Sequence, residues 1–282
     1  AYITEITPQH QRGRAMSVVA TLFTVGELIG WLCAKIFLDS YTSGKWRVLL
    51  FWVAVPNLIA FVVLVIYLEE SPRFAIFHNF ESGINVLNTM HKMNNQDREL
   101  RLEEHEREGL RNWIETEKNK NFTKESKLKM LFSKENFSVT CKLAIMWFVL
   151  SFTYYGIIFI LPLVYSVQGS NSSDTGGHNL NDLLWGIFGE LPSYALTYWL
   201  IEHSTFGRKN SMILSYWGCA IACIIVFFST GVIMNSLVFL SKCFMMTAFT
   251  IIYIYAPEMY HTSCRTTGFG ITNAASRLGA SF

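Results

Sequence analysis

Six long apolar stretches dominate the sequence and restrict what the chain can fold into. Each holds about 20 residues with few charges, which is the length that an α-helix needs to cross the hydrocarbon core of a bilayer. The composition agrees, because 51% of the 282 residues are hydrophobic and only 16% are charged, which is too apolar for a soluble domain of this size. We therefore predict an all-α membrane protein with spans at about 15–38, 46–68, 142–166, 183–201, 210–230 and 236–257, and a seventh span that begins near residue 266.

The distribution of charge predicts how these spans are oriented. Arg12, Arg208 and Arg265 lie on one side of the predicted membrane, together with the long charged segment 69–141. The loop 167–182 on the other side contains no lysine or arginine. Because loops rich in lysine and arginine remain on the cytoplasmic side, we expect the loops near the three arginines and the charged segment to be cytoplasmic.

Segment 69–141 is predicted to be a cytoplasmic helical linker between a first group of spans in residues 1–68 and a second group in residues 142–282. Ile84 and Leu87 belong to a run with helical spacing of apolar residues, and a highly charged helical stretch follows it. Acidic residues nearly balance basic ones in this segment, which argues against a nucleic-acid partner.

No arrangement of residues points to covalent chemistry. The sequence contains no phosphate-binding loop and no Ser–His–Asp or metal-ligating pattern, and its histidines are solitary. The six cysteines lie in or beside apolar runs, where a cysteine usually acts as a small buried apolar residue. We therefore expect no enzyme activity, no cofactor and no metal site.

A pattern of the form Tyr-x2-Glu-x6-Arg occurs twice, about 250 residues apart along the printed numbering. Its members are Tyr2, Glu5 and Arg12 in the first copy and Tyr255, Glu258 and Arg265 in the second. Both copies fall at the cytoplasmic end of a predicted span, and an even number of spans separates them. This is a parallel repeat of the kind that relates the two halves of some transporters.

An ordered set of motifs then makes a family resemblance specific. "LEESPRF", "FGRK" and "PEMYHTSCRTTGFG" resemble motifs of the major facilitator superfamily, at residues 68–74, 206–209 and 257–270. "MWFVLSFTYYGIIF", "GELPS" and "SRLGA" are similar to motifs of its organic ion transporters and synaptic-vesicle-glycoprotein-related transporters. His261 and the absence of an aspartate before the Gly-Arg-Lys motif depart from the family pattern.

The resemblance implies the major facilitator fold, in which two pseudo-symmetric bundles of six helices enclose a central site. By this comparison the chain covers the end of the fourth helix to the middle of the eleventh, and it is expected to be an internal piece of a longer protein. The resemblance also implies that ion pairs between the two halves close the cytoplasmic side. The candidates are Glu5, Arg12, Glu70, Arg73, Arg208, Glu258 and Arg265, with Glu69 and Glu202 beside them. The alternative is a solvated charged face, which would have no reason to repeat its spacing.

Charged residues inside the spans are candidates for the solute or proton site. Glu27 lies roughly 18 Å along its helix at about 1.5 Å per residue, near the membrane midplane, and Arg277 is about as deep, whereas Glu190 lies in the outer half. Charges at this depth are rare and usually face a water-filled cavity, although they can also pair with one another as structural ion pairs. Lys35 and Lys242 are nearer the span ends, so we expect them to extend toward the membrane surface.

Four aromatic residues lie near mid-depth of the span 142–166: Trp147, Phe152, Tyr154 and Tyr155. Aromatic side chains offer apolar walls, faces for cations and hydroxyl groups for hydrogen bonds, and the resemblance implies that this helix lines the cavity. Packing between helices is the alternative role. Because successive helical residues point about 100° apart, at most one of the two tyrosines is expected to face the cavity squarely.

These observations predict a secondary active transporter of a small organic solute that works by alternating access in a lipid membrane. By resemblance, a basic residue at Arg277 favours an organic anion, an acidic residue at Glu190 favours a cation, and a zwitterion fits both. A coupling proton carried by Glu27 or Glu190 is a further hypothesis, because burial favours the protonated form of a carboxyl group. The alternative is a transporter fold that serves as a receptor or as a structural subunit with partner chains; a channel fits the motifs less well.

Overall fold

The computed structural model describes residues 2–7, 11–38, 44–93, 103–119, 124–169, 183–203, 205–260 and 264–282. In these ranges the chain forms twelve helices, and the only strand-like pairing is an isolated bridge between Leu38 and Gly44. The all-α prediction is therefore confirmed. The helices are α1 (Tyr2–Ile6), α2 (Arg12–Phe37), α3 (Trp46–Tyr67), α4 (Pro72–His78), α5 (Phe80–Met93), α6 (Glu104–Asn119), α7 (Lys124–Leu131), α8 (Lys134–Gly169), α9 (Leu183–Glu202), α10 (Gly207–Phe227), α11 (Gly231–Glu258) and α12 (Arg265–Ser281).

Five of these helices, among the described residues, are long and apolar enough to cross a membrane: α2, α3, α8, α10 and α11. This confirms an integral, multi-pass membrane protein. The predicted span 183–201 does form a helix, α9, but α9 is not among the five. Its two glutamates, its proline and its tyrosines lower its hydropathy.

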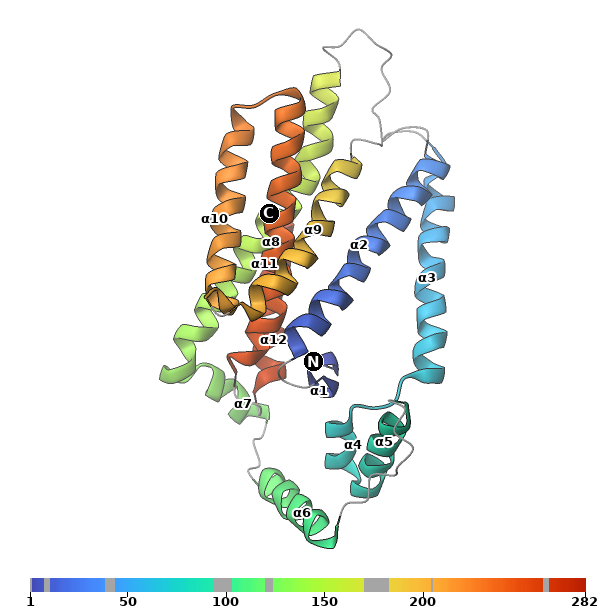
Figure 1. Ribbon diagram of the computed structural model, residues 1–282, viewed down its shortest axis with the longest axis vertical. Helices are drawn as coiled ribbons and strands as arrows, with labels where there is room; N and C mark the ends of the chain where they lie inside the picture. Colours follow the sequence, from blue (N-terminus) through green and yellow to red (C-terminus); the bar gives the residue numbers. More distant parts are fainter. Residues whose placement is uncertain are drawn as a thin grey trace.

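The long helices pack around α11. Helices α8, α9, α10 and α12 contact α11 in the group on the left of Figure 1, and α2 leans across α9 with α3 on its outer side. In its most apolar window α11 is 67% buried, whereas α3 has no buried residue there. A helix that is apolar all round faces lipid or other protein, so α11 forms the core and α3 lies at its edge.

Small residues allow helices to approach closely where the charged residues lie. A Cβ atom at Gly189 of α9 would overlap the backbone of Phe239 in α11, and one at Gly279 of α12 would overlap the backbone of Phe148 in α8. Such close contacts between backbones are typical of membrane helices that pack through glycine. These contacts determine the depth and the orientation of two charged residues. Glu190 follows Gly189 directly, and Arg277 lies two residues before Gly279.

The contact between α2 and α9 also depends on small side chains. Gly13, Ser17 and Thr24 are the buried residues of α2, and their spacing places them on one face of the helix. A Cβ atom at Gly13 would overlap the side chain of Ile201 in α9. The α2 helix therefore presents a narrow polar stripe to α9 and leaves most of its large apolar residues exposed.

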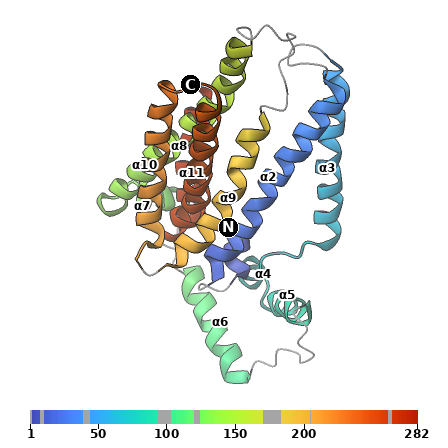
Figure 2. The same ribbon diagram turned by 45° about the horizontal axis from the view of Figure 1, so that its top comes forward.

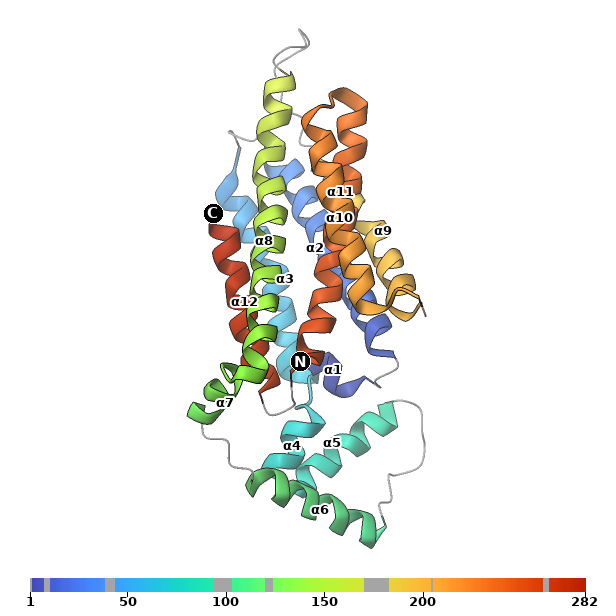
Figure 3. The same cartoon turned by 90° about the vertical axis from the view of Figure 1, so that its left-hand side faces the viewer.

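The charged segment forms helices at one end of the bundle. Helices α4, α5 and α6 lie together below α1 and the end of α3, and α7 leads into α8 at the same end (Figures 2 and 3). Ser71 caps α4, because its side chain accepts a hydrogen bond from the backbone of Phe74 at 3.1 Å. The starts of α2, α10 and α12 also lie at this end, which we call the linker end (Figure 1). The division into residues 1–68, 69–141 and 142–282 stays a prediction.

Candidate functional site

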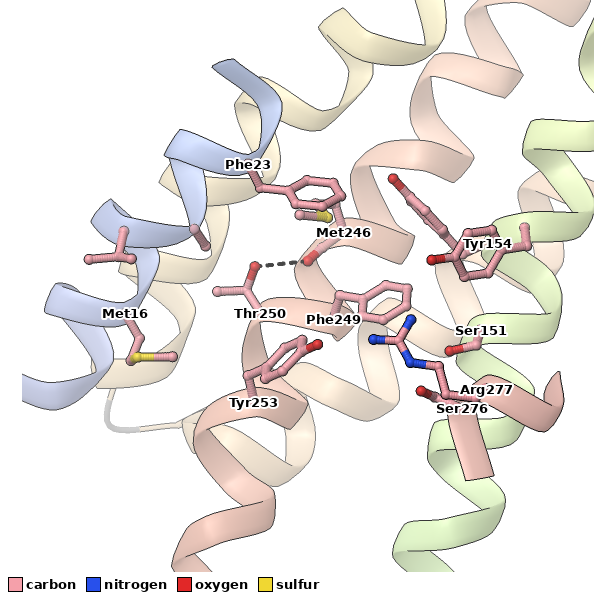
Figure 4. Close-up of a pocket in the computed structure, with 13 residues that line it drawn as sticks. Met16, Phe23, Ser151, Tyr154, Met246, Phe249, Thr250, Tyr253, Ser276 and Arg277 are labelled. Carbon is pink, nitrogen blue, oxygen red and sulfur yellow. Dashed lines mark hydrogen bonds between the residues drawn. The ribbon is translucent and has the colours of Figure 1, made fainter. Parts of the chain in front are cut away.

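A cavity of about 350 Å³ lies between α2 and the helices α8, α11 and α12 (Figure 4). It therefore adjoins both predicted halves of the chain. Most of its lining is aromatic or aliphatic, with a few hydroxyl groups. The lining residues are Met16, Val19, Ala20, Phe23, Ser151, Tyr154, Tyr155, Met246, Phe249, Thr250, Tyr253, Ser276 and Arg277.

Arg277 is the charged residue among the described residues that line this cavity. In Figure 4 its guanidinium group extends from α12 toward Phe249 and Tyr154. No carboxylate in the described part of the chain pairs with it. A guanidinium group presents several donors in a planar fork that suits a carboxylate or a phosphate, so the cavity offers a binding group for an anion.

The four aromatic residues expected on the cavity wall divide into two pairs. Tyr154 and Tyr155 both line the cavity, and the expectation that at most one of them faces it squarely stays a prediction. The two rings meet edge to face at 5.4 Å, and the cavity is wide enough to contact both. Trp147 is fully buried behind the wall and packs on Tyr253, and Phe152 stacks on Phe148 instead of lining the cavity.

Three further aromatic residues line the cavity although no sequence motif singled them out: Phe23, Phe249 and Tyr253. Phe249 and Tyr253 are four residues apart, so they share a face of α11. This spacing was visible in the sequence, but it is equally typical of helix packing.

A second polar site lies one helical turn beyond the cavity along α11. Lys242 is only 4% exposed, and its Nζ lies 3.1 Å from Oε1 of the fully buried Glu190. The ammonium group also lies 4.1 Å from the ring centre of Tyr154, a cation–π contact. The expectation that Lys242 extends to the membrane surface is therefore wrong, because α11 turns this residue toward α9 and its carboxylate. Lys35 is exposed in the last turn of α2, beside Trp31.

Hydrogen bonds connect this ion pair to α2. The hydroxyl oxygen of Tyr154 lies 2.9 Å from Oε1 of Glu27 and 3.2 Å from Oε1 of Glu190. Thr24 donates to Oε2 of Glu190 at 3.1 Å and lies 2.7 Å from the hydroxyl of Tyr194. We call Thr24, Glu27, Tyr154, Glu190, Tyr194 and Lys242 the buried cluster. It brings together Glu27 and Glu190, whereas Arg277 lies apart on the cavity wall.

The linker end carries a different ion pair. Arg208 at the start of α10 donates from Nη2 to Oε1 of Glu258 at 3.0 Å, and its Nε lies 2.6 Å from Oε2. The contact thus combines one hydrogen bond with a second close approach of the two charged groups. Both residues belong to the segment 142–282, so this pair does not connect the two predicted halves, contrary to the expectation for the gate.

The repeated motif does occupy equivalent positions in the fold. Glu5 lies in α1 and Arg12 begins α2, while Glu258 ends α11 and Arg265 begins α12. Arg12, Glu258 and Arg265 line one small hollow at the linker end. The two copies of the motif therefore converge there.

The remaining gate candidates are placed only in part. Glu70 is exposed just before α4, and the backbone oxygen of Glu69 accepts a hydrogen bond from the hydroxyl of Tyr2 at 2.9 Å. The side chains of Glu5, Arg73 and Glu202 and the whole of His261 lie outside the described residues. Within the described ranges no group of three His, Cys, Asp or Glu residues could hold a metal, and the six cysteines are free thiols.

The helical fold and its apolar spans define an integral membrane protein, and comparisons with known proteins identify its family. A model of the Major Facilitator Superfamily matches residues 1–282. The chain therefore belongs to the major facilitator superfamily. The structure of the proton:xylose symporter XylE, solved with 6-bromo-6-deoxy-D-glucose, has the same fold, with a TM-score of 0.71 and 18% sequence identity over 100% of this chain and 57% of that chain.

Two relatives indicate which members of the superfamily this chain resembles. The synaptic vesicle 2-related protein of Pongo abelii is 26% identical over 98% of this chain and 50% of its own length. The organic cation/carnitine transporter 7 of Arabidopsis thaliana is 26% identical over 99% of this chain and 61% of its own length. Within the superfamily the chain is thus similar to a synaptic vesicle 2-related protein and to an organic cation/carnitine transporter. It spans about half the length of the first of these relatives.

Proposed function

We propose that the protein containing this chain is a secondary active transporter that moves a small organic anion, or the anionic end of a zwitterion, by alternating access. The observation that carries the proposal is the placement of Arg277. It lines a mostly aromatic and aliphatic cavity of about 350 Å³ and has no carboxylate partner in the described part of the chain. A guanidinium group that lines a cavity without a carboxylate partner favours an anionic ligand.

The buried cluster supports an anion over a cation. Glu190 does not line the cavity, and Lys242 already neutralises it. Glu27 does not line the cavity either. A cationic solute would therefore meet aromatic faces but no free carboxylate. The name of the Arabidopsis relative includes an organic cation as well as carnitine, so it does not itself favour an anion.

The position of the cavity supports alternating access. It lies between α2 of the first predicted half and α8, α11 and α12 of the second, where rocking of one bundle against the other would open either side. The hollow lined by Arg12, Glu258 and Arg265 lies at the linker end, which we infer to be cytoplasmic. Charge pairs at this end would then bias the protein toward the conformation that is closed there.

Uptake by the full-length protein tests the proposal. Cells that express it are given three labelled solutes of similar size: an aromatic carboxylate, a zwitterion and a quaternary ammonium ion. Arg277→Ala should lower uptake of the carboxylate about 10- to 100-fold, because a hydrogen bond to a charged group contributes about 1.5–3 kcal/mol. Arg277→Lys should retain part of it.

Arg111→Ala is the matched control, because Arg111 is an exposed residue of α6 that pairs with Glu81. It should transport like the wild type. Uptake of the quaternary ammonium ion alone, or undiminished carboxylate uptake in Arg277→Ala, would contradict the proposed substrate class. Absence of uptake for all three solutes would favour the alternative role as a receptor or structural subunit.

A further inference from the structure

The buried cluster contains more hydrogen-bond acceptors than its protons can satisfy when both carboxyl groups are ionised. Tyr154 has one O–H group, yet its oxygen lies within hydrogen-bond distance of a carboxyl oxygen of Glu27 and of one of Glu190. It can donate to only one of them at a time. The other contact is a hydrogen bond only if that carboxyl group is protonated and donates to the tyrosine oxygen.

The other hydrogen-bond donors of the cluster, on Lys242 and Thr24, are directed at Glu190. Oε1 of Glu190 faces the ammonium group of Lys242, and Oε2 accepts from Thr24. Because Thr24 donates its hydroxyl hydrogen to Glu190, the 2.7 Å contact requires Tyr194 to donate to Thr24. Glu190 is thus well satisfied as a carboxylate, whereas Glu27 has a hydrogen bond with Tyr154 and lies beside Glu190.

Counting charges leads to the same result. Two carboxylates and one ammonium group would give the cluster a net negative charge in a region where Glu190 is fully buried, Lys242 nearly so and Glu27 half-buried. An uncompensated charge in such a place is costly, and a carboxyl group avoids the cost by binding a proton. One proton on the Glu27–Tyr154–Glu190 chain makes the cluster neutral and completes its hydrogen bonds.

We propose that the buried cluster is a binding site for one exchangeable proton, which Glu27 and Glu190 share through Tyr154. This proton holds α2 against α8 and α9. The proposal rests on the transport function proposed above and assigns its coupling site. Loss of the proton to water leaves a second carboxylate beside the first, and their repulsion then favours separation of α2 from α9.

The surroundings contain few other groups that could compensate this charge. The ionisable groups that face Glu27 are Tyr154 of α8, Glu190 and Tyr194 of α9, and Lys242 of α11. The neighbouring helix α3 has no ionisable residue between positions 48 and 66. Arg277 of α12 lines the adjoining cavity, and Tyr154 lines it too, so Tyr154 provides a route for the proton between the cavity and Glu27.

Infrared difference spectroscopy of the full-length protein in lipid vesicles tests the site without any solute. The carbonyl stretch of a buried protonated carboxyl group should be present at neutral pH and disappear as the pH is raised. Glu27→Gln should abolish this band, because Glu190 then remains ionised beside Lys242. Glu81→Gln on the exposed surface of α5 is the matched control and should leave the band unchanged.

Lys242→Met provides the opposite test. Without the ammonium group both carboxyl groups should be protonated, so the band should about double. Spin labels on α2 and α10 report the motion: their separation should increase with pH in the wild type and stay constant in Glu27→Gln.

The outcomes separate this site from the transport function. Absence of a titrating band, or a band that survives Glu27→Gln, would overturn the proton site even if solute uptake is found. A band that behaves as expected in a protein that takes up none of the three solutes would support the proton site and contradict the proposed transport.

Discussion

The two ion pairs of the molecule are similar in chemistry and opposite in environment. Lys242 and Glu190 lie 3.1 Å apart with side chains that are 5% and 0% exposed, whereas the side chains of Arg208 and Glu258 are 34% and 33% exposed. The more exposed pair has the shorter contact, because Nε of Arg208 lies 2.6 Å from Oε2 of Glu258. Distances alone would therefore rank the two pairs wrongly.

Solvent decides what each pair contributes. An exposed pair typically contributes about 0–1 kcal/mol, because water and salt already stabilise its separated charges. In a buried pair the loss of one partner leaves a charge without compensation, which costs about 3–5 kcal/mol. The pair at the linker end can therefore break and re-form during a conformational cycle, whereas the buried pair holds α9 and α11 together throughout it.

The largest effect is expected for Lys242→Met. The substitution leaves Glu190 buried without its cation, so Glu190 must bind a proton to stay neutral, and the free energy of unfolding in mixed micelles should fall by about 3–5 kcal/mol at neutral pH. The loss should be smaller in acid, where binding this proton costs less. The double variant Lys242→Met/Glu190→Gln removes both charges and should recover most of the stability; a double variant as unstable as the single one would contradict this account.

A smaller effect is expected for Thr24→Val, which keeps the shape of the side chain but removes the donor to Glu190. Leaving this buried contact unmade should cost about 1–3 kcal/mol, measured by the same unfolding assay. Thr24→Ser keeps the hydroxyl group and serves as the control. If valine and serine were equally destabilising, the loss of packing and not of the hydrogen bond would explain both.

The smallest effect is expected at the exposed pair. A double-mutant cycle with Arg208→Gln and Glu258→Gln should give a coupling energy of about 0–1 kcal/mol that vanishes at high salt. A coupling energy as large as that of the buried pair, or one that salt does not change, would remove the distinction between the two regions.

The spans could be predicted closely because hydropathy is a local property. The span expected at 46–68 is the helix Trp46–Tyr67, and the span expected at 236–257 lies inside Gly231–Glu258. The helix α8 begins eight residues before the expected 142, because the polar residues from Lys134 onward continue the same helix at the linker end. Hydropathy locates the apolar part of a helix and not its polar extension.

The site was less predictable because it depends on which residues of distant helices face each other. The depth of Glu27, Glu190 and Arg277 marked them as candidates, but the sequence gives no sign that Lys242 turns toward α9. That contact requires the close approach at Gly189, a tertiary feature. The aromatic residues were ambiguous for the same reason, since a helix face that lines a cavity and one that packs in the core have the same periodicity.

Tyr154 belongs to two sites at once, since its ring lines the cavity and its hydroxyl group joins Glu27 to Glu190. Its single hydrogen cannot serve a solute and a carboxyl group simultaneously. A solute that accepts this hydrogen changes the affinity of the cluster for its proton. Thermodynamic reciprocity then requires that the proton changes the affinity for the solute by the same factor. One hydroxyl group is thus sufficient to make the two ligands interdependent.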